Sequence, residues 1–246
     1  MIIFFFSLGL ILGSFFNVVG LRFPKNIPFA NDRSACPHCN HQLSWYENIP
    51  VLSFIIQRGK CRHCKENISY IYPIVELLTG ILFAISFSII GFQLEQITAL
   101  LLISMLMIVF VTDIKYMLIP NKILLFFLPV FIFMRIIVPI HPWWSSLLGG
   151  IIGTGLLALI IIVSRGGMGA GDMKLFGVLG IVLGMEKILL AFFLSCMIGA
   201  IIGIILLLFK IVERKQPIPF GPYIVFAALI SYFYGDALII WYFNLL

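Results

Sequence analysis

The sequence predicts an all-α polytopic membrane protein with about eight transmembrane helices and a zinc-ribbon-like loop between the first two. Hydrophobic residues make up 62% of the 246 residues and charged residues only 11%, whereas about a quarter of the residues of a soluble domain are charged. The apolar runs are continuous and lack the alternation of membrane β-strands, so helices are the expected spanning elements. Four of the five cysteines fall in the one long polar segment.

Eight hydrophobic segments approach the roughly 20 residues that a helix needs to cross a bilayer. They are 2–20, 71–91, 97–112, 121–139, 146–163, 173–185, 188–209 and 220–241. The sixth is short and is expected to be a half-helix or to lie where the membrane is thin. The first lacks a basic n-region and a small-residue cleavage site, so we expect a retained span and not a removed signal peptide. The predicted domains are a first helix (1–21), a zinc-binding loop (22–70) and a seven-helix membrane domain (71–246).

The placement of lysine and arginine predicts the orientation, because cytoplasmic loops are enriched in both. Residues 22–69 and the loops after the third, fifth and seventh segments hold most of them, while the opposite loops hold only Lys187. Both termini should therefore face outward and the long loop should be cytoplasmic. This pattern and anionic lipid explain the net charge of +6 without nucleic acid as a partner. The residues on the predicted cytoplasmic side are Arg22, Lys25, Arg33, Arg58, Lys60, Arg62, Lys65, Lys115, Lys122, Arg165, Lys174, Lys210, Arg214 and Lys215.

Two Cys-x-x-Cys pairs in the long loop have the spacing of a four-thiolate zinc site. The reducing cytosol disfavours disulfides. A closed site of this kind has no open coordination position, so we expect a structural Zn²⁺ that folds a segment too small for its own core. A catalytic or redox role is the alternative. The four predicted ligands are Cys36, Cys39, Cys61 and Cys64.

Asp113 and Asp172 lie at the ends of long apolar segments. A carboxylate at membrane depth is costly and marks function by default. On the predicted topology both fall at the cytoplasmic face. Two carboxylates in one poorly solvated site tend to share a proton, which is the basis of aspartic proteolysis. The alternative for each is a solvated helix end, and Asp236, near the outward end of the last segment with no expected partner, is interpreted in that way.

Residues 166–171, directly before Asp172, contain four glycines. They allow a tight turn and the close approach of an extended peptide. The segment lacks the Lys-Ser/Thr ending of a P-loop and follows no strand, which disfavours nucleotide binding. Lys115 and Lys174 each lie two residues after an aspartate, on a different helix face, and are expected to reach lipid headgroups.

Small and polar residues inside the apolar segments predict close helix packing. Asn17 would be costly against lipid and is expected to face the helix bundle. Five glycines in the sixth and seventh segments have the spacing that lets helices approach closely. They are Gly177, Gly180, Gly184, Gly199 and Gly203.

Six motifs follow one another along nearly the whole chain. They are Gly13-Ser14-Phe15-Phe16-Asn17-Val18 with Arg22-Phe23-Pro24, the two cysteine pairs, Tyr72-Pro73-Ile74-Val75-Glu76, Asp113 through Asn121, Gly169 through Leu175, and Pro219-Phe220-Gly221-Pro222. In this order they resemble the bacterial type IV prepilin peptidases, membrane aspartic proteases of the Gly-x-Gly-Asp type.

The resemblance implies a substrate, two activities and a location. The substrate would be a prepilin or pseudopilin, cut on the cytoplasmic side of the bacterial cytoplasmic membrane, with Asp113 and Asp172 activating a water and protonating the leaving amine. Many members then methylate the new N-terminus with S-adenosylmethionine. Gly59, Lys60 and Glu76 are the residues predicted for that cofactor.

Other functions stay open at this stage. The methyltransferase could be silent, leaving only the peptidase. Membrane carboxylates also serve proton relays, so a small proton-coupled transporter with a zinc-ribbon loop is the alternative from another class, although no repeated halves are evident. A Gram-positive competence pseudopilus would suit the composition. The sequence does not fix the oligomeric state, nor whether the two aspartates touch without substrate.

Overall fold

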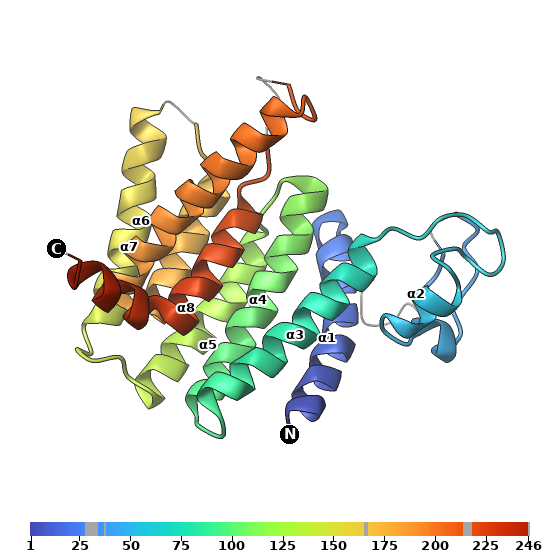
Figure 1. Ribbon diagram of the computed structural model, residues 1–246, viewed down its shortest axis with the longest axis horizontal. Coiled ribbons are helices and arrows are strands. Elements are labelled where there is room, and N and C mark those ends of the chain that lie inside the picture. Colours follow the sequence, from blue (N-terminus) through green and yellow to red (C-terminus); the bar gives the residue numbers. More distant parts are fainter. Residues whose placement is uncertain (28–33, 37, 165–166, 214–217, 246) are drawn as a thin grey trace. The chain divides into compact units, whose positions relative to one another are not determined.

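The chain folds almost entirely into helices, and the described residues contain no strand beyond two isolated bridges (Figure 1). The structure is a computed structural model that describes residues 1–27, 34–36, 38–164, 167–213 and 218–245. The predicted all-α class is confirmed. Gly166 and four of the basic residues used for the orientation, Arg33, Arg165, Arg214 and Lys215, lie outside the described residues.

Internal contacts divide the chain into two compact units, Met1–Val111 and Thr112–Leu246. The predicted division at residues 21 and 70 is a different kind of boundary and stays a prediction. The helix α4 (Glu95–Tyr116) runs from the first unit into the second.

The first unit is built on two long helices that pack against each other and on the cysteine segment between them. Asn17 of α1 is only 1% exposed and its Nδ2 donates a hydrogen bond to the carbonyl of Tyr72, at 3.1 Å. This confirms that Asn17 faces inward. The two long helices are α1 (Ile2–Arg22) and α3 (Ile71–Ile90). Between them lie η1 (Phe23–Lys25), η2 (Trp45–Asn48) and α2 (Leu52–Ile56).

The second unit is organised around α7, which packs against α5, α6 and α8 (Figure 1). Its helices are α5 (Asn121–Ile137), α6 (Ser145–Val163), α7 (Ala170–Leu208) and α8 (Gly221–Phe243). The backbones of α6 and α7 touch, because a Cβ on Gly180 would collide with the carbonyl of Gly149. Close packing is thus confirmed at Gly180. It is wrong at Gly203, where a Cβ would meet no atom of the described residues within 4 Å.

Helix α7 is broken at Gly184, where φ is 78° and ψ is 176°. Backbone groups released inside a membrane need other partners. Arg135 of α5 supplies one, since its Nε and Nη2 donate to the Val182 carbonyl at 3.1 and 2.7 Å. The hydroxyl of Ser145 accepts the Met185 N–H at 3.0 Å. The sequence located a boundary here, between the sixth and seventh segments, but gave no role to Arg135 or Ser145.

Among the described residues, six helices are long and apolar enough to cross a membrane. The helix α5 has 17 residues and lies just below that length, and the two halves of α7 count as one helix. Every predicted hydrophobic segment therefore lies on a helix, but the count of eight is not confirmed. The chain is a multi-pass membrane protein.

Candidate active site and metal site

Asp113 lies at the end of α4, where its side chain is bonded to the first residue of α8. It is 5% exposed, and its Oδ2 accepts the Gly221 N–H at 2.7 Å. A Cβ at position 221 would stand 2.6 Å from the same oxygen. Glycine is therefore required there for the backbone to reach the carboxylate. This contact joins the motif of Asp113 to the motif of Gly221. The sequence analysis found the Gly221 motif but did not predict its contact.

Asp172 lies in the first turn of α7 and is 8% exposed. Its Oδ2 accepts the N–H of Gly169 at 3.2 Å, so the glycine segment turns back on its own carboxylate. A Cβ on Gly171 would approach the Ile119 side chain to 3.1 Å. Without side chains at these glycines, the start of α7 packs directly on the segment that follows Asp113.

Lys174 ties the same two motifs together. Its Nζ donates to the Asn121 side-chain oxygen at 3.0 Å. The predicted reach of Lys174 to lipid headgroups stays a prediction, because this exposed hydrogen bond uses only one of the three ammonium donors. Lys115 is exposed at the end of α4, and its predicted reach to lipid headgroups stays a prediction.

The two buried carboxylates are close enough to interact electrostatically. They reach this arrangement from positions 113 and 172, on opposite ends of two helices within one compact unit. Two carboxylates in one poorly solvated site cannot both ionise freely, and such pairs tend to share a proton. A proton-sharing pair can supply a base and an acid together.

Asp236 provides a contrast within the same unit. Its side chain is 75% exposed and pairs with the Lys187 ammonium at 2.7 Å. Its predicted solvation is confirmed, whereas the expected lack of a partner is wrong. An exposed carboxylate with a cation beside it has none of the constraints found at Asp113 and Asp172.

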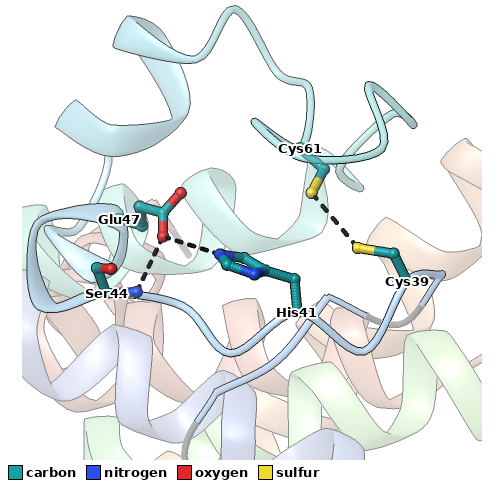
Figure 2. A network of polar contacts seen from close by, with 5 residues as sticks. All are labelled: Cys39, His41, Ser44, Glu47 and Cys61. Carbon is teal, nitrogen blue, oxygen red and sulfur yellow. Dashed lines mark hydrogen bonds and ion pairs between the residues drawn. The ribbon is translucent and has the colours of Figure 1, made fainter.

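In the first unit, the four predicted cysteines come together, and their Sγ atoms all lie within 4.8 Å of one another. The Sγ atoms of Cys36 and Cys64 are 3.8 Å apart. Those of Cys39 and Cys61 are 4.0 Å apart (Figure 2). Tetrahedral zinc with Zn–S bonds of about 2.3 Å requires S–S separations of about 3.8 Å. The cluster therefore fits a Zn²⁺ ion held by four thiolates.

The two cysteine turns repeat one backbone pattern. The N–H of Cys36 bonds to the carbonyl of His41, and the N–H of Cys61 bonds to that of Glu66. The residue four positions after the first cysteine of each pair, Asn40 or Lys65, returns its N–H to that cysteine and has a positive φ, of 54° and 65°. The segment is thus two matching cysteine turns facing each other.

Hydrogen bonding prepares one thiol of this cluster to ionise. The backbone N–H groups of Cys64 and His63 lower the pKa of Cys61 to about 6. At Cys64 the backbone N–H of Glu66 also favours the thiolate, but burial and the neighbouring thiols prevail and raise the pKa to about 12. Four thiolates so close together need a cation to be stable, which a metal ion provides.

The buried carboxylate of Glu47 contacts residues that follow the first cysteine turn. Glu47 is 7% exposed, accepts the Ser44 N–H at 2.9 Å and lies 3.9 Å from the Nε2 of His41 (Figure 2). The His41 ring stacks on that of His63, with centroids 5.1 Å apart. Glu47 is not among the residues predicted for any site.

A cavity of about 300 Å³ lies between the cysteine segment, α1 and α3. Glu76 of α3 lines it, is 7% exposed, and accepts the N–H of Val51 at 2.8 Å and a hydrogen bond from Ser14. Val51 has a φ of 61°, which is rare for a β-branched residue. Gly59 and Lys60, the other two residues predicted for the cofactor, lie on the turn before Cys61 and are absent from the described wall of the cavity. That wall is formed by Ser14, Val18, Leu21, Arg22, Ser34, Ala35, Cys36, Leu43, Glu47, Asn48, Ser53, Phe54, Gln57, Cys61, Ile68, Tyr72, Pro73 and Glu76.

Comparisons with known proteins match both units. A model of the bacterial peptidase A24 N-terminal domain matches residues 7–90, and one of the type IV leader peptidase family matches residues 100–204. A prepilin leader peptidase/N-methyltransferase of Bacillus subtilis (strain 168) is 45% identical over 237 residues, covering 96% of each chain. Proteins of the same name from Aeromonas salmonicida (strain A449) and Pseudomonas aeruginosa are 33% identical, over 96% and 93% of this chain and 92% and 89% of theirs. No solved structure matches the chain significantly.

Proposed function

Because the chain belongs to the prepilin leader peptidase/N-methyltransferase family, we propose that it cleaves the leader from prepilins or pseudopilins with Asp113 and Asp172 and methylates the new N-terminus in its first unit. The observation that supports the peptidase role is that three motifs far apart in the sequence meet around two buried carboxylates. The contacts between the motifs are Asp113–Gly221, Gly171–Ile119 and Lys174–Asn121. Family membership favours this activity over the transporter that the sequence left open.

In the proposed peptidase mechanism, the carboxylate form of the pair removes a proton from a water molecule. That water attacks the carbonyl carbon of the peptide bond. The protonated form donates its proton to the leaving nitrogen as the C–N bond breaks, and the proton taken from the water leaves the pair singly protonated again. The hydrogen bond from Gly221 fixes the Asp113 carboxylate, and that from Gly169 fixes Asp172. The glycine backbone beside Asp172 leaves room for an extended substrate.

The proposed orientation places the pair at the cytoplasmic face of the bacterial cytoplasmic membrane, with both termini outside. It rests on the distribution of lysine and arginine. Asp113 ends α4 and Asp172 begins α7, so one face of the membrane can hold both. Anionic lipid is the partner expected for the basic loops.

Separate Asp113→Asn and Asp172→Asn substitutions test the peptidase role. Each variant should lose prepilin cleavage by about 10³-fold or more, as expected when a general acid–base group is removed, while remaining folded in the membrane. Asp236→Asn is the matched control and should cleave normally. Cleavage retained by either of the first two variants would remove the pair from the mechanism.

For methylation, we propose that the cavity at Glu76 holds S-adenosylmethionine. Glu47 and Glu76 in its wall suit a sulfonium and an ammonium group, and Arg22 suits a carboxylate. The cofactor, when bound, supplies an electrophilic methyl group. Glu76 would also orient the substrate amine and take its proton. Gly59 and Lys60 would act indirectly, through the turn that carries Cys61.

Glu76→Gln tests this assignment through binding as well as activity. The variant should bind labelled S-adenosylmethionine at least about tenfold more weakly, the loss expected from one charge-assisted contact, and still cleave prepilin. Unchanged cofactor binding would place the site elsewhere. The cysteine cluster is proposed to hold a structural Zn²⁺ that shapes one wall of this cavity, because Cys36 and Cys61 line it.

A further inference from the structure

A second cavity, of about 550 Å³, adjoins the proposed cofactor cavity in the first unit. It lies between α1 and the segment around η2, and we call it the α1 groove. Its described wall is mostly apolar and holds no charged side chain. The residues of this wall are Ile11, Ser14, Phe15, Val18, Ser34, Trp45, Asn48, Ile49 and Pro50.

The α1 groove and the cofactor cavity share part of their walls. The buried carboxylate of Glu76 stands at this junction, because it bonds to the hydroxyl of Ser14 and to the N–H of Val51, the residue after Pro50. The backbones of α1 and α3 touch here, since a Cβ on Gly13 would stand 2.9 Å from the Cα of Glu76. The groove therefore leads to the carboxylate proposed for methylation. The residues that line both cavities are Ser14, Val18, Ser34 and Asn48.

The outer part of the α1 groove opens toward lipid. Ile11 and Phe15 are 60% and 47% exposed on α1, a helix long and apolar enough to cross a membrane. Ile11 lies about three turns, or roughly 16 Å, before the end of α1 at Arg22. Trp45, which is 80% exposed on the η2 side, is of the residue type that gathers where membrane meets water. The groove thus reaches from the headgroup level into the hydrocarbon.

We propose that the α1 groove holds the N-terminal residue and the first apolar turns of a cleaved pilin, with the amine at Ser14 and Glu76, a role that rests on the methylation function proposed for the first unit. An apolar chain that begins with an amine fits, because the groove is apolar, ends at a carboxylate and opens to lipid. S-adenosylmethionine is charged and arrives from water, so a groove without charged side chains does not suit it. The two substrates would therefore meet at Glu76 from two sides.

Ile11→Trp tests this proposal, because Ile11 lines only the α1 groove and a larger side chain there fills it. Ile3→Trp is the matched control, since Ile3 is 80% exposed on the same helix and lies outside both described walls. With a leaderless pilin in lipid nanodiscs, Ile11→Trp should raise the KM for methylation by roughly tenfold, the size expected from lost apolar contact, with kcat little changed. Binding of labelled S-adenosylmethionine should be unchanged.

Three results would overturn the proposal. They are a normal KM for the leaderless pilin with Ile11→Trp, an equal rise with Ile3→Trp, and weaker binding of labelled S-adenosylmethionine by Ile11→Trp, which would assign the groove to the cofactor. Methylation by the unchanged protein and its loss in Glu76→Gln, measured in parallel, report on the methylation function itself.

Photo-crosslinking identifies the occupant without relying on methylation. A photoreactive phenylalanine in place of Phe15 should form an adduct with the first residues of the leaderless pilin. One in place of Phe133, which is 60% exposed on α5 and outside the described wall of the groove, should not. Adducts of the Phe15 variant with lipid alone, or with a second copy of the enzyme, would contradict the proposal.

Discussion

The two units of this protein build their chemical sites in different ways. In the first, two short Cys-x-x-Cys turns supply four ligands from 29 consecutive positions, and local backbone hydrogen bonds shape each turn. In the second, the carboxylates come from helices 59 positions apart, and glycines let the backbones of three motifs touch. A site made by local spacing depends on its ligands, whereas a site made by packing depends on residues that take no part in the chemistry.

The largest effect of this difference should appear at Gly221. A Gly221→Ala substitution puts a methyl group 2.6 Å from the Asp113 oxygen, and displacing a catalytic group by about 1 Å can lower the rate by about 10²-fold. Prepilin cleavage should fall by that amount while cofactor binding in the first unit is unchanged. Enzyme kinetics and equilibrium binding measure the two.

Gly235→Ala on the same helix is the control for that substitution. The atoms nearest to its Cβ would belong to the flexible side chain of Lys187, the first at 3.1 Å. It should cleave normally. Full activity of Gly221→Ala would show that the backbone contact to Asp113 does not position the carboxylate.

Removal of the metal is the corresponding change in the first unit. Cys39→Ser should abolish zinc binding, because three thiolates leave the tetrahedral site incomplete. Metal analysis should find about one zinc per chain in the unchanged protein and nearly none in the variant. Limited proteolysis should cut the segment between α1 and α3 much faster, and methylation should be lost.

Cys196→Ser is the control, since Cys196 lies on α7 apart from the four-sulfur cluster. Its zinc content should not change. A Cys39→Ser protein that keeps stoichiometric zinc would rule out the four-thiolate assignment.

Arg135 tests whether packing in the second unit depends on residues outside the chemistry. Arg135→Met leaves the Val182 carbonyl without these donors, and an unpaired buried polar group costs about 1–3 kcal/mol. Thermal unfolding in detergent should shift to lower temperature by several degrees. Arg135→Lys should recover part of the loss, because it restores one donor. An unchanged melting temperature in the Met variant would mean that the hydrogen bonds from Arg135 do not stabilise the helix break at Gly184.

The smallest effect is expected at the exposed pair of Lys187 and Asp236. Such pairs contribute about 0–1 kcal/mol because water screens them. Lys187→Met should leave both the melting temperature and cleavage close to normal. A large loss of either would show that this ion pair, and not only the buried carboxylates, constrains the second unit.

The sequence predicted most of the chemistry but less of its support. The cysteine spacing was sufficient to find the four-sulfur cluster, since its cysteines are close in sequence. Asp113 and Asp172 stood out because carboxylates are rare beside long apolar segments. The bond from Gly221 to Asp113 and the engagement of Lys174 with Asn121 could not be predicted, since they depend on how helices pack. The contact of Arg135 could not be predicted either, because the sequence shows only that this residue is a charge inside an apolar segment.

The mass of a prepilin's N-terminus after incubation with S-adenosylmethionine tests the central claim, that the two units carry two separable reactions. The unchanged protein should give a cleaved and methylated product, Cys61→Ser a cleaved product without the methyl group, and Asp172→Asn only intact prepilin. Intact prepilin from Cys61→Ser, together with cleavage by Asp172→Asn, would contradict the assignment of cleavage to the buried carboxylates and of methylation to the cysteine unit.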